Sequence, residues 1–419
     1  MAERPTVAAG AREEADRIIR EESPRILGVL QALHDDPELS GEERRASLRL
    51  GQELASEGFE IEPGAGGLPT AFVARRGAAG AGHTRRAGGS AGRPATRAAA
   101  RVAFLAEYDA LPELGHGCGH NLVAAAALGA GIAVGRLVEQ LGGEVRVCGT
   151  PAEETVGGKV VLAEQGLFDD LDAAMMVHPG NEHRVFTTSL ASQSVQVEFH
   201  GRSAHAAAHP DKGINALDAM IQLFVAVSHI RGSSGRDVRI PGVILHGGER
   251  PNVVPDRAVA RFSVRAATSE ERDGALERVR GMAGAIARAT GCRLAFELTD
   301  RPTPDFLTNR ALAEAYRGHL ASEGIATNDM PRDHMGSLDM GTLSRRVPSL
   351  HAYVAIAPPD VVLHTRAFAE ATISERGRQA ALLAARMLAR TAVDLMCDPE
   401  LLRRVRGEFE QARSPVGEP

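Results

Sequence analysis

The order of strand-like and helix-like segments limits the fold of this chain more than any other feature. Short apolar runs alternate with helical periodicity between about residues 59 and 177, and the alternation resumes after residue 306. Strands that alternate with helices favour a sheet covered by helices. We therefore predict an α/β domain with a mixed sheet, assembled from both parts of the chain.

The spacing of apolar residues locates the elements of this domain. Strands are expected at Phe59–Ile61, Thr70–Ala74, Arg101–Glu107, Glu144–Gly149, Ala173–Val177 and Leu350–Ile356. Helices are expected at 11–34, 41–56, Asn121–Leu141, 309–322, 366–390 and 391–413. The segment 76–100 contains little besides Gly, Ala and Arg, so we expect a long mobile loop there, whose role stays open.

The pattern changes between about residues 190 and 300. Strands are expected here at Ser194–Phe199, Gly242–His246, Ala258–Arg265 and Arg293–Leu298, with helices at 213–230 and 269–289. This β-α-β-β-α-β order is that of a ferredoxin-like module. Because 419 residues are too many for one compact core, we predict two domains. One combines residues 1–188 and 301–419, and the other is an inserted α+β domain at 189–300.

Composition excludes several functional classes. The net charge is −6, so nothing indicates binding to nucleic acid or to anionic lipid. No continuous apolar run reaches the roughly 18 residues of a membrane helix, and the first residues lack the apolar core of a signal peptide. The four cysteines lie far apart in the sequence. We expect a cytoplasmic protein whose cysteines are reduced.

Residues that can bind metal ions follow several of the predicted strands. The Gly-rich run GHGCGHN at 115–121 contains a thiol and an imidazole two residues apart, an acidic pair follows the strand that ends at Gly149, and two more histidines stand in MMVHPG and VVLHTR. Catalytic residues of α/β sheets gather just after the carboxyl ends of strands. Thiolate, imidazole and carboxylate are the ligands that zinc-like ions prefer. The candidates are Cys118, His120, Glu153 or Glu154, His178 and His364.

These candidates suffice for two ions that share one thiolate. Cys118, Glu154 and His364 would hold one ion, and Cys118, His120 and His178 would hold the other. Each residue also has an ordinary structural interpretation: a buried small hydrophobe for Cys118, a helix N-terminus for the acidic pair, and core histidines for the others. Asp109 could orient His120 or merely cap a turn, and we interpret His116 as a structural residue or as one that supports a ligand.

Several motifs, in order, resemble the M20 metallopeptidase and amidohydrolase family, and most closely its Cys-Gly-His branch. The resemblance extends from about residue 15 to 390 and is carried by AEYDALPELGHGCGHN, GTPAEETVGGK, MMVHPG, GRSAHAAAHPDKGINALDA, GGERPNVVPD and HTRAF. It implies a metallohydrolase catalytic domain with an inserted dimerisation or lid domain. It also implies two Zn²⁺ or Mn²⁺ ions per subunit and a homodimer formed through the insertion.

The resemblance also assigns roles to individual residues. Cys118 would bridge the ions, Glu153 would be the general acid/base, and His205 would reach the partner subunit's site to stabilise the oxyanion. Asn252 and Arg265 would hold the carboxylate end of the substrate. The remaining metal ligands would be His120, Glu154, His178 and His364. Two departures stand out: Glu107 takes the place of a histidine ligand found outside this branch, so we leave it out of the ligand set, and Asn121 replaces an aspartate.

The sequence therefore predicts metal-dependent hydrolysis of a small-molecule amide: an N-acyl amino acid, an aminobenzoyl-glutamate-like compound or an unusual dipeptide. Two alternatives stay open. A cysteine-nucleophile amidase would use Cys118 with His120, although residues two apart rarely reach an attack geometry. A non-catalytic metal-bound binding or scaffold protein would be expected to have lost Glu153, which is present.

Overall fold

The structure is a computed structural model that describes residues 7–77, 99–234, 237–329 and 336–413. It divides into two compact units, Met1–Thr187 with Leu307–Arg332 and Thr342–Pro419, and Thr188–Phe306 with Asp333–Gly341. Residues 301–306 and 336–341, which the sequence pattern assigns to the larger unit, group with the insertion. Most of the Gly/Ala/Arg-rich segment predicted to be a mobile loop lies outside the described residues.

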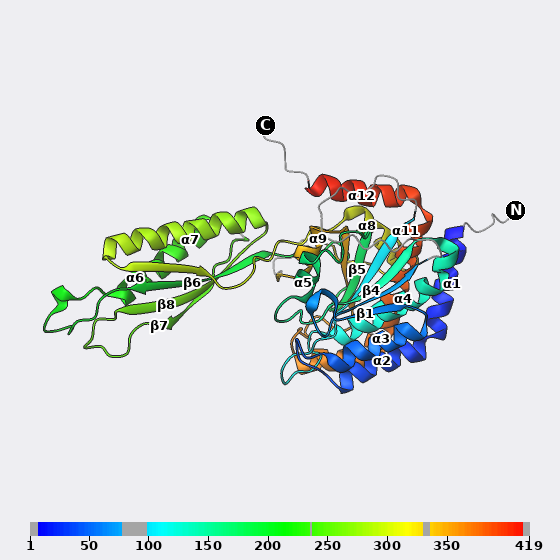
Figure 1. The fold of residues 1–419 in the computed structure, drawn as a ribbon, viewed down its shortest axis with the longest axis horizontal. Coiled ribbons are helices and arrows are strands. Elements are labelled where there is room, and N and C mark those ends of the chain that lie inside the picture. Colours follow the sequence, from blue (N-terminus) through cyan, green and yellow to red (C-terminus); the bar gives the residue numbers. More distant parts are fainter. Residues whose placement is uncertain (1–6, 78–98, 235–236, 330–335, 414–419) are drawn as a thin grey trace. The chain divides into compact units, whose positions relative to one another are not determined.

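The larger unit is built on a mixed sheet of six strands in the order β1-β2-β4-β3-β5-β10 (Figure 1). The strands are β1 (Glu60–Pro63), β2 (Phe72–Gly77), β3 (Arg101–Ala106), β4 (Glu144–Gly149), β5 (Ala173–Gly180) and β10 (Ser349–Ala355). β4, β3, β5 and β10 run parallel, and β2 joins β4 antiparallel. The carboxyl ends of four strands therefore meet at one edge of the sheet.

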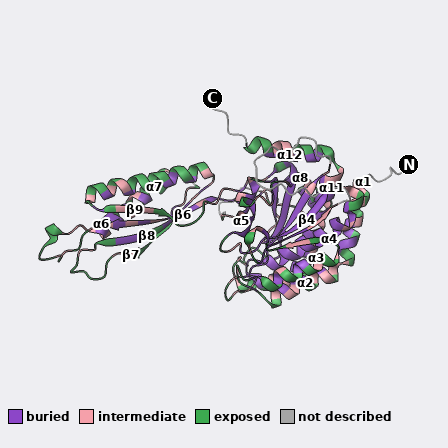
Figure 2. Ribbon diagram, in the orientation of Figure 1, coloured by how far each residue is buried: buried purple, intermediate pink, exposed green. Residues whose placement is uncertain are grey.

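Helices enclose this sheet. They are α1 (Val7–Glu21), α2 (Ser23–Asp35), α3 (Arg44–Ser56), α4 (His120–Leu141), α5 (Gly158–Glu164), α8 (Arg310–Ser322), α10 (Arg366–Ile373), α11 (Glu375–Cys397) and α12 (Pro399–Arg413), while α9 (Met340–Ser344) spans the boundary between the two units. α4 packs on β3, β4 and β5, and α11 packs on α4. Figure 2 shows the buried residues on the strands and on the inward sides of the helices.

Two helices predicted as continuous are each interrupted. The helix predicted at 11–34 is divided into α1 and α2 at Glu22, and Pro24 occupies the first turn of α2, where its missing amide hydrogen costs nothing. The helix predicted at 366–390 is divided at Ser374, whose hydroxyl accepts a hydrogen bond from Gly377 N at 3.1 Å. A side-chain cap of this kind starts a new helix. Apolar periodicity persists through both breaks and therefore did not reveal them.

Helix α4 is apolar on every side. By length and composition alone it is the one described helix that could cross a membrane, although the sequence pattern predicts no such segment. In this fold, 94% of its most apolar window is buried. A helix that is hydrophobic all round fits the centre of a large core as well as a bilayer, and α4 begins with His120 at the edge of the sheet where the parallel strands end.

The smaller unit has its own core and an antiparallel sheet in the order β7-β8-β6-β9. Its elements are β6 (Ala191–His200), α6 (Ala216–Ser233), β7 (Gly242–His246), β8 (Arg257–Ala266), α7 (Ser269–Thr290) and β9 (Arg293–Leu298). Both helices pack against the sheet and each other. Asn215 caps α6, and Thr268 and Glu271 form a capping box on α7. The predicted β-α-β-β-α-β order is present.

Candidate metal centre

The carboxyl edge of the parallel strands carries the candidate ligands of the larger unit. Glu107 and Asp109 follow β3, Glu153 and Glu154 follow β4, and His178 lies within β5. His364 lies in the loop that follows β10, and Cys118 and His120 lie in the turn that leads into α4. Residues separated by more than 200 positions in sequence therefore meet because parallel strands end at the same edge.

A glycine shapes the turn that presents Cys118 and His120. Gly119 has a φ of 91°, a left-handed conformation that side chains disfavour. A Cβ atom at this position would lie 2.3 Å from the Cγ atom of Pro179. The turn therefore needs glycine both for its backbone conformation and for its close approach to β5.

The first ligand group is buried. One ligand atom from each of Cys118, His120 and His178 lies within 4.8 Å of the others. Cys118 Sγ lies 3.6 Å from His178 Nε2. His120 is fully buried, and Cys118 and His178 are 8% and 6% exposed, so an ion held by these three side chains would be nearly removed from solvent.

The second ligand group shares Cys118 and opens to solvent. One ligand atom from each of Cys118, Glu154 and His364 lies within 4.8 Å of the others, with His364 Nε2 3.4 Å from Glu154 Oε1. The side chain of His364 is 52% exposed. His364 adopts a φ of 64°, which is unusual for a residue with a side chain and is typical of strained functional positions. Glu153 and Glu154 also form a group with His120.

Hydrogen bonds orient both buried imidazoles. His178 Nδ1 donates to the Pro179 carbonyl at 2.8 Å. His120 Nδ1 donates to the Asp109 carbonyl at 3.0 Å and also lies 2.9 Å from Asp109 Oδ1. The other nitrogen of each ring, Nε2, is therefore available as a metal ligand. Asp109 Oδ2 accepts a hydrogen bond from Glu154 N at 3.0 Å, so the carbonyl and the carboxylate of Asp109 together position candidate ligands from two different loops.

The donor set fits a pair of divalent cations. Zinc lies about 2.0–2.2 Å from nitrogen or oxygen ligands and about 2.3 Å from sulfur ligands. Two neighbouring ligand atoms of a tetrahedral zinc ion are therefore about 3.3–3.6 Å apart. The Cys118–His178 and Glu154–His364 distances, 3.6 and 3.4 Å, agree with this spacing. His120 Nε2 and Glu154 Oε1 are buried and lack a hydrogen-bond partner among the described residues, although buried polar atoms normally have one.

Charge at the site also favours a cation. Burial opposes protonation of His120, but the negative charges of Cys118, Asp109 and Glu107 raise its pKa well above the usual value. Burial raises the pKa of Cys118 to about 12, so its thiolate requires a neighbouring positive charge. Burial lowers the pKa of His178 to about 4, which keeps this ring neutral, as a ligand must be.

Comparison with known proteins identifies the family. Residues 190–290 match the peptidase dimerisation domain of M20 proteins. Over 415 residues the chain is 36% identical to the Xaa-Arg dipeptidase of Mus musculus, covering 95% of this chain and 92% of that protein. The chain belongs to the M20 family. This confirms the resemblance drawn from the sequence motifs.

Other M20 proteins resemble this chain as well. It is 32% identical over 330 residues to one subunit of the p-aminobenzoyl-glutamate hydrolase of Escherichia coli, covering 74% of this chain and 64% of that protein. A dinuclear metal-binding peptidase of the M20 family from Bacillus subtilis has the same fold, with a TM-score of 0.69 and 20% identity over 90% of this chain and 99% of that chain. As a member of this family, the protein is a hydrolase of the amidohydrolase and dipeptidase class.

The substrate-binding candidates of this M20 protein lie at two separate places in the smaller unit. The exposed His205 forms a bridge with Val253, and Asn252 O accepts a hydrogen bond from Ala206 N at 3.0 Å. Arg265 lies at the opposite end of β8 from these loops. The eight residue-to-residue steps from Arg257 to Arg265 span about 27 Å. Within one chain, Asn252 and Arg265 therefore cannot hold the same carboxylate.

A buried carboxylate that no sequence pattern indicated supports the Glu153–Glu154 loop. Glu43 is fully buried, and its Oε1 accepts a hydrogen bond from Ala152 N at 2.8 Å. Ala152 has a φ of 58°, a conformation that costs a residue with a side chain roughly 1–2 kcal/mol. Thr70 Oγ1 donates to the other oxygen of Glu43 at 2.9 Å. The residues that Glu43 joins are 27 and 109 positions away.

We expect Glu43→Ala to lower turnover at least tenfold, because the loop loses the acceptor that holds Ala152 next to Glu153. Unsatisfied donors at Ala152 and Thr70 should also cost about 1–3 kcal/mol each in unfolding free energy. Glu38→Ala is the matched control, since Glu38 is also buried but accepts from Ala46 N at the start of α3. Urea unfolding and kcat measured on both variants check this expectation. Equal losses of kcat would contradict it.

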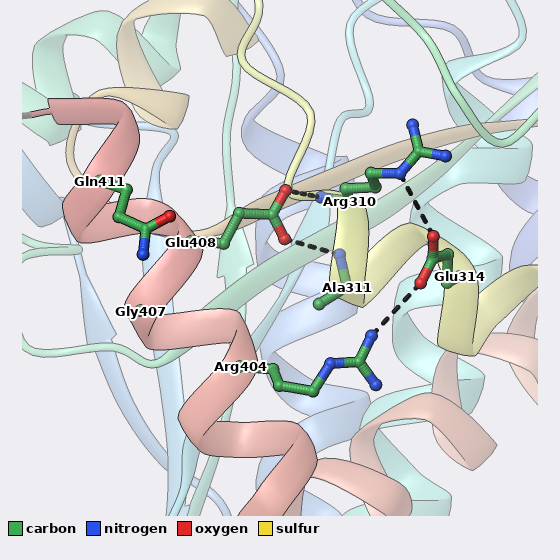
Figure 3. Close-up of a pocket in the computed structure, with 7 residues that line it drawn as sticks. All are labelled: Arg310, Ala311, Glu314, Arg404, Gly407, Glu408 and Gln411. Carbon is green, nitrogen blue, oxygen red and sulfur yellow. Dashed lines mark hydrogen bonds and ion pairs between the residues drawn. The ribbon is translucent and has the colours of Figure 1, made fainter. Parts of the chain in front are cut away.

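The pocket in Figure 3 holds none of the candidate ligands. It lies between α8 and α12 and is lined by Arg310, Ala311, Glu314, Arg404, Gly407, Glu408 and Gln411. Glu314 pairs with Arg310 and with Arg404, each at 3.3 Å. Glu408 accepts hydrogen bonds from the first backbone amides of α8. These contacts hold α12 against α8, and we assign this pocket a structural role.

Proposed function

We propose that this M20 protein is a dinuclear metal-dependent hydrolase that cleaves an amide bond and releases a free amino acid. One observation carries the proposal: Cys118 belongs to both a buried ligand group and a solvent-facing one. A shared thiolate lets one cleft hold two ions side by side. Cys118, His120 and His178 would hold one ion, and Cys118, Glu154 and His364 the other.

Zn²⁺ or Mn²⁺ would suit this donor set, and the thiolate favours zinc. When bound, two such ions polarise a carbonyl and lower the pKa of water, which is the chemistry they supply in hydrolases. Glu153 then takes a proton from the attacking water and passes it to the leaving amine. Asp109 holds His120 in the tautomer that turns Nε2 toward the centre.

The smaller unit would supply substrate contacts. Arg265 would bind the carboxylate of the leaving amino acid through charge-assisted hydrogen bonds. His205 of the partner subunit would stabilise the oxyanion that develops on the substrate carbonyl, an effect of about 3–4 kcal/mol for one good donor. We assign Asn252 to the partner-facing loops with His205, because their backbones lie side by side and far from Arg265.

The exposed edge of the smaller sheet supports a homodimer formed through β7. Val243, Ile244 and Leu245 are exposed on this edge strand, and an exposed apolar edge pairs readily with a second strand. The match of 190–290 to a dimerisation domain supports a second copy as the occupant. We expect a dimer by sedimentation, and a folded monomer after Ile244→Arg. A wild-type monomer would contradict this assembly.

The substrate is proposed to be a small amide with a free carboxylate, and dipeptides that end in arginine are our first choice. The support is the 36% identity to the Xaa-Arg dipeptidase of Mus musculus. Metal-free protein should be tested on Xaa-Arg dipeptides, p-aminobenzoyl-glutamate and N-acetyl amino acids, with Zn²⁺ or Mn²⁺ restored in turn. We expect hydrolysis that requires added metal. Complete inactivity on the panel with either ion would contradict the proposal.

A cysteine-nucleophile amidase is less well supported. Cys118 Sγ lies 3.6 Å from His178 Nε2, but burial raises the pKa of the thiol, whereas a nucleophilic cysteine needs a lowered one. A purely binding role would leave Glu153 without use. Activity that resists chelators and is lost on thiol alkylation would favour the cysteine mechanism.

A further inference from the structure

A buried ion pair lies beside the candidate metal centre. Glu107 directly follows β3, and Lys159 is the second residue of α5. They are 2% and 0% exposed, and Lys159 Nζ contacts Glu107 Oε1. Lysine and glutamate are almost never fully buried unless they are paired, so this position requires an explanation.

The other oxygen of Glu107 faces the metal-binding atom of His120. Glu107 Oε2 lies 3.5 Å from His120 Nε2. Both atoms are buried, and neither has a hydrogen-bond partner in the described part of the chain. The carboxylate therefore has one oxygen on the ammonium of Lys159 and one directed at the site where a cation would bind.

Lys159 supplies the positive charge that a carboxylate buried at this position needs. A negative charge in a low-dielectric interior acts strongly on a cation a few ångströms away. The ammonium, on the far side of the carboxylate, weakens this attraction and holds the group in place.

We propose that the Glu107–Lys159 pair sets the affinity of the centre for divalent cations: Glu107 attracts the ion bound by His120, and Lys159 orients the carboxylate and moderates its charge. This inference rests on the proposed metal centre and adds two residues to it. It also revises the interpretation from the sequence, in which Glu107 is left out of the metal site.

The test uses full-length metal-free protein titrated with Zn²⁺ and with Co²⁺, the latter followed by the charge-transfer absorption of its thiolate bond. Glu107→Gln keeps the shape and removes the charge, so we expect the affinity to fall by about 10- to 100-fold, as for other supporting residues of metal sites. Lys159→Met removes the moderating charge and should bind at least as tightly as the wild type. The metal affinity of the double variant Glu107→Gln/Lys159→Met should lie between those of the two single variants.

Glu144→Gln is the matched control. Glu144 is a buried carboxylate of the same sheet that pairs with Arg146, but it starts β4, at the end of the strand away from the ligands. We expect this variant to keep wild-type metal affinity. If Lys159→Met does not fold, the metal affinities of Glu107→Gln and Glu144→Gln are compared, and this comparison is sufficient to test the inference.

Opposite effects of the two single variants support the inference, because a merely structural pair would weaken binding whichever partner is removed. The inference is overturned if the metal affinity of Glu107→Gln stays within twofold of the wild type. It is also overturned if Lys159→Met and Glu107→Gln lose metal affinity equally. Failure of wild-type protein to bind either ion would instead overturn the proposed metal centre itself.

Discussion

Glu153→Ala is expected to lower kcat by about 100- to 10,000-fold, the usual contribution of a general acid/base, while both metal ions stay bound. Glu153 belongs to neither of the two ligand groups that contain Cys118. Its loss should therefore remove proton transfer and leave the metal sites intact. Steady-state kinetics combined with metal analysis of the same preparation checks this prediction.

Glu154→Ala is the informative comparison for Glu153→Ala. Glu154 Oε1 lies 3.4 Å from His364 Nε2, so this variant should lose activity together with one ion. A Glu153→Ala enzyme with near-normal turnover and full metal content would exclude Glu153 as the proton carrier. Loss of metal from Glu153→Ala would instead assign it as a ligand.

Cys118→Ala is expected to lose both ions, because its sulfur belongs to both ligand groups. His178→Ala and His364→Ala should each lose one ion and keep part of the other site. The wild type should also gain about 2.7 kcal/mol of stability at metal concentrations 100 times the dissociation constant, and Cys118→Ala should not. Metal content by mass spectrometry and thermal unfolding with and without Zn²⁺ measure both effects.

Cys148→Ala controls for the loss of a buried thiol. Cys148 lies on β4, is 1% exposed, and is absent from the ligand groups found among the described residues. The Cys148→Ala variant should lose some packing energy but should keep both metal ions. If Cys118→Ala retained two ions, the shared-thiolate arrangement would be wrong.

The candidate ligands that local sequence patterns indicated form groups of neighbouring atoms in the structure. His178 lies within β5, Glu153 and Glu154 closely follow β4, and the other candidates lie in the segments that follow β3 and β10. Alternation of strands and helices is enough to predict parallel strands, and parallel strands bring their ends together. The helix breaks at Glu22 and Ser374 could not be predicted from apolar periodicity. Helix capping depends on single residues, whereas periodicity averages over many residues.

The sequence by itself determined which side chains could bind metal and which strands would bring them together, because both follow from residue type and local periodicity. Only the tertiary structure identified the carboxylates that support them. Glu43 reaches Ala152 across 109 positions, and Glu107 meets Lys159 only because the end of β3 and the start of α5 lie at the same edge. Glutamate and lysine in a sequence usually indicate solvent-exposed surface, and burial, which depends on the whole fold, converts them into parts of a site.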